Sequence, residues 1–113
     1  MNKAIQAIAA LLQAETWKMA IGTGTNPAWI DNQSLQTEID RQDVIPTLET
    51  TNLLNDTLVF DGTFAMADPT NLSELGLFLG APTAILFCRI TFTPITIPAG
   101  FPLPIKVKVV VVR

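Results

Sequence analysis

Residues 72–92 read LSELGLFLGAPTAILFCRITF, and this stretch decides the fold. It holds two runs rich in large apolar residues, 72–79 and 85–92, which are separated by GAPT at residues 80–83. Apolar runs of this length, bounded by glycine and proline, are typical of β-strands joined by a tight connection. The stretch therefore predicts two consecutive antiparallel strands.

A third strand pattern lies just upstream, over residues 58–64. Leu58, Phe60 and Phe64 share one face of this segment, as expected for a strand that packs on a core. Asp61 and Gly62 interrupt the apolar pattern, and this pair predicts a bulge or a tight bend.

The two ends of the chain add further strands. Residues 17–21 alternate large and small or polar side chains, as in a half-buried strand. Residues 105–112 alternate apolar residues with Lys106 and Lys108 and then become apolar throughout, so we expect the last part of this strand to be covered on both faces. Strands separated by short turns predict a mainly β fold, a small antiparallel β-sandwich or barrel-like domain.

One α-helix is expected, at the start of the chain over residues 3–14. Its residues are strong helix formers, and Asn2 is available as the N-cap. Ile5, Ile8, Leu11 and Leu12 are spaced to share one helical face.

The remaining segments have fewer regular patterns. We expect an ordered loop over residues 28–43, a strand over 44–53, and a stiff, proline-rich arm over 93–104. Residues 1–113 form a single domain in this interpretation, with the β-domain over residues 17–112.

Composition excludes several kinds of chemistry. The chain has 113 residues with 49% hydrophobic and 15% charged residues, no histidine, no tyrosine and one cysteine, Cys88. Without histidine, Ser-His-Asp and Cys-His nucleophilic pairs and imidazole metal sites are impossible within this chain. A net charge of −3 and the absence of a basic patch argue against nucleic-acid binding. We expect no catalytic residues, no cofactor, no metal and no membrane span.

Three other residue groups have both a functional and a structural interpretation. The sequence GTGT at residues 22–25 resembles part of a phosphate-binding loop, but it lacks a third glycine and a following helix, so a turn is favoured. Glu38, Asp40 and Asp43 around Arg41 could hold a cation or form a solvated charge cluster, and the second is favoured. Trp17 and Trp29 would suit a carbohydrate-binding module if exposed, although core packing is the commoner use of tryptophan.

Glu74 is the most informative carboxylate. It is the only charge in a strand otherwise fit for burial, and a buried carboxylate needs a cationic or hydrogen-bonding partner. Arg89 is the only charge in the neighbouring predicted strand. We predict a structural Glu74–Arg89 pair, with Arg41 as the alternative partner.

Taken in order, these pieces resemble the amino-terminal region of bacteriophage tail-collar fibre proteins and related small virion proteins. The likeness runs from about Lys3 to Pro94. The pieces that carry it are the helix, the strand end Ala20-Ile21-Gly22-Thr23-Gly24, the loop residues Leu35, Glu38 and Arg41, the strand Glu74-Leu75-Gly76-Leu77-Phe78, and residues 86–92 with Pro94. Fibre proteins of this family continue into a collar and a shaft, whereas this sequence ends at Arg113. The resemblance therefore implies a stand-alone attachment-type domain.

The resemblance and the composition together predict a non-enzymatic virion structural protein, made in the host bacterial cytoplasm. Its expected partners are other virion proteins of the tail or baseplate, and the alternative is a capsid cement protein on the major capsid protein. High apolarity with little charge suits obligate contacts, so we expect a homo-oligomer, with a trimer favoured. The predicted interface residues are Ile5, Ile8, Leu12, Pro98, Phe101, Pro102, Val110 and Val112.

Overall fold

The computed structural model of the chain describes residues 2–27, 33–50, 56–80 and 85–110. One helix, α1 (Asn2–Ala14), precedes all of the strands. The strands are β1 (Trp17–Gly22), β2 (Glu38–Val44), β3 (Thr47–Glu49), β4 (Thr57–Phe64), β5 (Thr70–Leu79), β6 (Ile85–Ile97) and β7 (Leu103–Val110). The expected mainly β fold with one N-terminal helix is confirmed.

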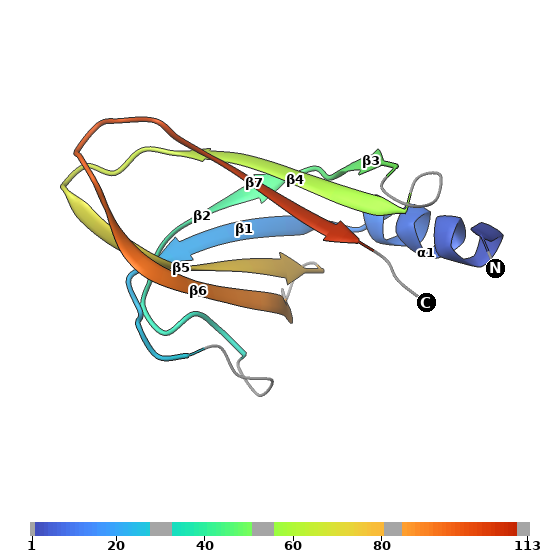
Figure 1. The fold of residues 1–113 in the computed structure, drawn as a ribbon, viewed down its shortest axis with the longest axis horizontal. Coiled ribbons are helices and arrows are strands. Elements are labelled where there is room, and N and C mark those ends of the chain that lie inside the picture. The colour runs from blue at the N-terminus through green and yellow to red at the C-terminus, as the bar shows by residue number, and fades with distance from the viewer. Residues whose placement is uncertain (1, 28–32, 51–55, 81–84, 111–113) are drawn as a thin grey trace.

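The strands form two antiparallel sheets that pack face to face (Figure 1). The first sheet has the order β2-β1-β5-β6, and the second has the order β3-β4-β7. β5 and β6 pair as predicted, with Leu79 opposite Ile85, although residues 81–84 between them lie outside the described part of the chain. The chain crosses from the first sheet to the second between β2 and β3, at Ile45 and Pro46.

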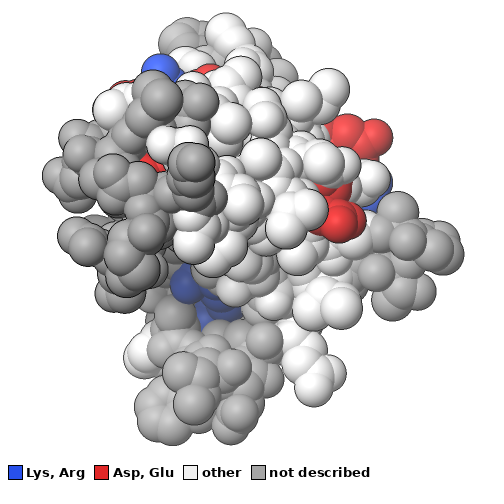
Figure 2. All heavy atoms as spheres, turned by 90° about the vertical axis from the view of Figure 1, so that its right-hand side faces the viewer, with Lys and Arg blue, Asp and Glu red and all other residues white. Residues whose placement is uncertain are grey.

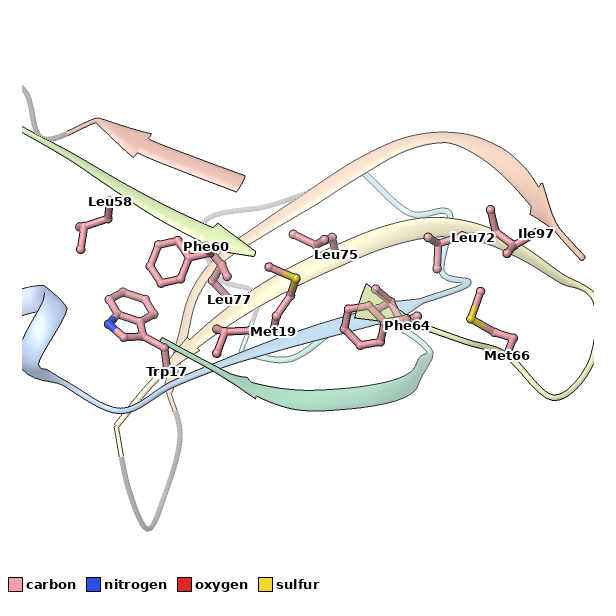
Figure 3. Packing of buried hydrophobic residues seen from close by; sticks show 12 residues of the cluster. Trp17, Met19, Leu58, Phe60, Phe64, Met66, Leu72, Leu75, Leu77 and Ile97 are labelled. Atoms are coloured by element: carbon pink, nitrogen blue, oxygen red, sulfur yellow. The ribbon is translucent and has the colours of Figure 1, made fainter. Parts of the chain in front are cut away.

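The core lies between the two sheets (Figure 3). Trp17 of β1 meets Phe60 of β4 edge to face, with ring centroids 4.7 Å apart. The predicted face of β4 is confirmed, because Leu58, Phe60 and Phe64 are all buried. The Trp17 indole N–H also donates to the carbonyl oxygen of Leu12 at 2.7 Å, which fixes the end of α1 against the sandwich.

Only part of the apolar face predicted for the helix contacts the body of the domain. Ala9 is fully buried and Leu12 packs against the core, but Ile8 and Leu11 are 47% and 70% exposed. The spacing of large apolar residues did not identify the buried face, because a helix that is apolar on most sides can dock through any of them.

Several sequence-based boundaries are wrong for identifiable reasons. Part of the expected loop is strand β2, whose alternating charges suit a sheet edge where most side chains meet water. The expected strand over 44–53 is reduced to β3 among the described residues. No bulge occurs at Asp61 and Gly62, which pair in regular register with Lys106 and Ile105.

The prediction of a stiff, proline-rich arm over residues 93–104 is also wrong, because β6 continues to Ile97 and β7 begins at Leu103. Both strands lie at sheet edges, where a proline without an N–H need not interrupt a ladder. Pro94 sits where the β5–β6 register shifts, between the pairs Glu74–Thr91 and Leu72–Ile95. Only residues 98–102 separate the two strands.

Candidate functional site

Glu74 lies on the outer face of the first sheet and is completely buried. Its Oε2 accepts hydrogen bonds from the backbone N–H of Thr37 at 2.7 Å and of Gly24 at 2.8 Å. Its Oε1 accepts from the N–H of Gln36 at 2.9 Å and from Arg89 Nε at 2.9 Å. Four donors from three separate segments of the chain therefore converge on one carboxylate.

These contacts hold a loop over the outside of the sheet. We call residues 23–27 and 33–37 the outer loop. Arg89 donates further hydrogen bonds to the carbonyl oxygens of Asn26 and Pro27, at 3.0 and 3.1 Å. Beside them, Leu35 forms a small second core with Ala20 and Phe78. The outer loop explains why β1 is buried on both faces and is not the half-buried strand that its pattern predicts.

The predicted Glu74–Arg89 ion pair is present, and both side chains are almost fully buried. The pair is diagonal across β5 and β6, because Arg89 lies opposite Gly76 and Glu74 lies opposite Thr91. Sequence reasoning did not identify the amide donors of Gln36 and Thr37. The glycine pair at residues 22 and 24 was the only available signal for these donors, since a Cβ at either position would meet the Glu74 carboxylate.

The environment of Glu74 favours its ionised form. Burial alone would raise the pKa of this carboxyl, but the hydrogen bonds from Thr37, Gln36, Arg89 and Gly24 outweigh burial and lower the pKa below its usual value. The anion bound by the Gly24 amide is thus the chain's own carboxylate. The turn prediction for GTGT is wrong at its start, because Gly22 belongs to β1 and the Thr23 N–H donates to the Thr37 carbonyl oxygen at 3.0 Å. Because both oxygens already accept two hydrogen bonds each, this cluster stabilises the fold and leaves little room for a ligand.

The other charged and aromatic candidates are engaged in local contacts. Arg41 donates to both carboxylate oxygens of Glu38, and its guanidinium lies 3.9 Å from the centre of the Phe78 ring. Lys18 pairs with Asp43 on the neighbouring strand. No cluster of metal-ligating side chains occurs among the described residues. Trp17 is buried and cannot stack on a sugar, and Trp29 lies outside the described residues.

A different kind of site lies along β6. Leu75 is buried in the core, and the residue directly opposite it, Ile90, faces the same side yet is 42% exposed. Ile85 lies opposite Leu79 and is 71% exposed. Phe87 touches the edge of the buried Trp17 ring, with ring centroids 5.1 Å apart, and is also 42% exposed. Side chains that point toward the interior of the sandwich therefore remain in contact with solvent.

The same incomplete burial occurs along β7 in the other sheet. Ile105, Val107 and Val109 pair with the inward-facing positions of β4 but are only partly buried. β6 and β7 are edge strands of different sheets, and they do not pair with each other in the described part of the chain. We call this region, formed by the inward faces of β6 and β7, the open side of the sandwich.

The opposite side of the sandwich is closed. The side-chain amide of Gln42 on β2 donates to the carbonyl oxygen of Thr63 on β4 at 2.7 Å and accepts from the Thr63 N–H at 3.2 Å. Incomplete burial is therefore a property of the β6–β7 side.

The end of the molecule at α1 is a second uncharged surface. Ile8, Leu11 and Ile45 are exposed there, and Ile45 precedes Pro46, whose carbonyl oxygen accepts a hydrogen bond from Gln13 Nε2. Figure 2 looks onto this end and shows uncharged side chains across the middle of the described surface, with charged groups at its margins.

The predicted interface residues have mixed outcomes. Ile8, Pro98, Phe101, Pro102 and Val110 are exposed, as an interface requires. Leu12 is half-buried and packs against the chain's own core, and its interface role stays a prediction. The side chain of Ile5 and all of Val112 lie outside what the structure describes. The exposed face of Val110 also means that the last strand is not covered on both faces within one chain.

Comparisons with known proteins add no identification. No protein-family model matches the chain, and a search of curated proteins finds no significant match. Within the described residues, no helix has the length and apolarity needed to cross a membrane.

Proposed function

We propose that this protein is a non-enzymatic structural subunit that acts through protein–protein contacts in an assembly of several copies. The observation that carries the proposal is the open side, where core-facing residues of two edge strands stay exposed in the single chain. Exposed apolar surface of this kind costs free energy unless a partner covers it. Obligate interfaces resemble a domain core that has been divided, and the open side has this character.

The assembly we propose is the virion of a tailed bacteriophage, with the chain as a tail-fibre or baseplate attachment subunit. The support is the resemblance in sequence order, whose pieces lie together in the fold. The glycine-rich end of β1, the outer loop with Leu35, and the strand segment 74–78 all meet around Glu74. A capsid cement protein is the alternative within the same class.

The first test is the molar mass of the purified protein by light scattering, compared with the chain mass of 12.3 kDa. We expect a stable multimer, with a trimer favoured. Ile90→Lys on the open side should reduce the mass to that of one chain. Ile39→Lys is the matched control, because Ile39 is 41% exposed on the distant edge strand β2 and its substitution should leave the mass unchanged. A wild-type protein that stays monomeric at high concentration would contradict the proposal.

The position in the virion needs a separate experiment. Antibodies against this chain should label the tail of phage particles whose genome encodes it, viewed by electron microscopy. Labelling distributed over the head would instead support the cement role, and particles without label would contradict both.

A further inference from the structure

The edge strands of the two sheets differ in how they are protected against pairing with another chain. β2 exposes Glu38, Asp40 and Asp43, and β3 is only three residues long. β7 is protected less completely: Pro104 removes one backbone donor near its start, and Lys106 and Lys108 face outward, so their charges oppose pairing with another cationic edge but not with a neutral one. Charges, prolines and short length are the usual means by which proteins block edge-to-edge contact.

The first eight residues of β6 lack these protections and have a single irregularity of register, at Phe87. Residues 85–92 contain no proline and a single charge, Arg89, whose side chain is 3% exposed and already bound to Glu74 and the outer loop. This segment is therefore a long, neutral edge with exposed apolar side chains. Such an edge presents a row of backbone groups to a partner strand.

From this geometry we infer that β6 of one copy pairs, in antiparallel fashion, with β7 of a neighbouring copy. The inference rests on the proposed function, and it names the partner as a second copy of this chain. β6 and β7 run in opposite directions from the turn at 98–102 (Figure 1). A rotation about an axis parallel to the strands keeps these directions, so β6 meets the next copy's β7 in the antiparallel sense. Two or three open sides would then face one another across that axis.

Charge selects this pairing over the alternatives. If β7 paired with β7 of another copy, Lys106 and Lys108 would lie close to like charges, which is unfavourable across neighbouring strands. If β6 paired with β2, the acidic side chains of β2 would lie beside an apolar strand without accessible cations. In the β6–β7 pairing, Lys108 keeps its partner Glu49 and meets no accessible like charge from β6.

Burial also favours this pairing. A β6–β6 contact would cover Ile85 and Ile90 but leave β7 open. A β6–β7 contact places both partly exposed inward faces in one continuous interior, so a single type of contact completes both sheets. The same contact, repeated around the axis, closes the assembly and leaves no open side.

The test uses the native Cys88, which lies on the core side of β6 opposite Leu77. Ile105→Cys, Val107→Cys and Val109→Cys place a second thiol along the inward face of β7, and three positions allow for an unknown register and for a variant that folds poorly. After mild oxidation, we expect at least one variant to form a disulfide between chains on a non-reducing gel. A disulfide within one chain is disfavoured, because facing sheets lie about 10 Å apart and a disulfide needs Cα atoms within about 7 Å.

The number of bands reports the symmetry. A three-fold ring gives one band of two linked chains and one band of three linked chains. A two-fold assembly gives only the band of two linked chains. Lys106→Cys and Lys108→Cys are the matched controls, because these positions face outward and should not reach Cys88 of another copy. Removing the native thiol by Cys88→Ser should abolish every cross-link.

The outcomes separate the inference from the function on which it rests. A wild-type multimer in which no inward cysteine links to Cys88, or in which the outward controls link equally well, overturns the β6–β7 pairing and leaves the assembly role standing. A wild-type monomer overturns both.

Discussion

Glu74 and Ile90 lie on neighbouring strands of one sheet, yet their surroundings are opposite. Glu74 is fully buried, and four donors from β6 and the outer loop satisfy its carboxylate. Ile90 faces the core beside the buried Leu75, but 42% of its surface stays exposed. The Glu74 cluster is complete within one chain, and the open side is not.

This difference shows which kind of feature indicates a function. Glu74 looks functional in sequence because an isolated charge in an apolar strand is unusual. In the fold it is a structural group, since an unsatisfied buried carboxylate would be too costly to retain. Ile90 looks ordinary in sequence, but its incomplete burial is the observation on which the proposed contact between copies rests.

The largest effect on the free energy of unfolding is expected at the Glu74 cluster. Glu74→Gln keeps the side-chain shape but breaks the buried Glu74–Arg89 ion pair, and removing one partner of a buried pair costs about 3–5 kcal/mol. We expect the free energy of unfolding in urea to fall by about that amount. Glu15→Gln, at an exposed position beyond α1, is the control and should change it little. A change in Glu74→Gln no larger than in the control would show that the cluster adds nothing.

A second comparison uses the facing residues Leu75 and Ile90. Leu75→Ala should lower the free energy of unfolding by about 2–5 kcal/mol at every protein concentration, because it opens a cavity in a closed core. If the copies associate, the free energy of unfolding increases with protein concentration. Ile90→Ala should mainly reduce this increase. Urea unfolding at two concentrations measures both effects. If Ile90→Ala resembled Leu75→Ala at low concentration, Ile90 would belong to the closed core.

The pH dependence of stability should also distinguish the two regions. Because the folded-state pKa of Glu74 is lowered, its contribution to stability is complete above the unfolded pKa of about 4.3 and is lost as pH falls through the folded value. As the pH is lowered below about 4, we expect the urea concentration at the unfolding midpoint to decrease more steeply in the wild type than in Glu74→Gln. Equal slopes in the two proteins would contradict a lowered pKa. Ile90→Ala should leave this slope unchanged.

The smallest effect concerns the thiol of Cys88. Burial raises the pKa of this thiol, so less of it is present as the reactive thiolate near neutral pH. We expect a disulfide reagent to label Cys88 several-fold more slowly in the assembled wild type than in the Ile90→Lys variant. The labelling rates of the two folded proteins are measured at the same pH. After unfolding, the two proteins should be labelled at equal rates, which is the control. Equal rates in the folded proteins would place Cys88 away from the contact between copies.

The sequence predicts the strands whose buried faces carry recurring apolar residues, including the edge strand β7, and it fails for the edge strand β2 and the second half of β6. Residues 58–64, 72–79 and 105–110 are predicted well because apolar residues recur along their buried faces. β2 is missed because its position at the sheet edge removes that signal, and β6 is shortened because Pro94 is tolerated only at an edge. Strand position within a sheet depends on non-local pairing, which a local pattern does not contain.

Composition and periodicity by themselves determined a mainly β domain with one helix, the absence of histidine chemistry, and the need of Glu74 for a cationic or hydrogen-bonding partner. Only the tertiary structure decided that backbone amides from residues 24, 36 and 37 share that carboxylate, and that the core-facing side of β6 stays open. The physical reason is that residue type sets what each group requires, while long-range packing decides whether the same chain supplies it.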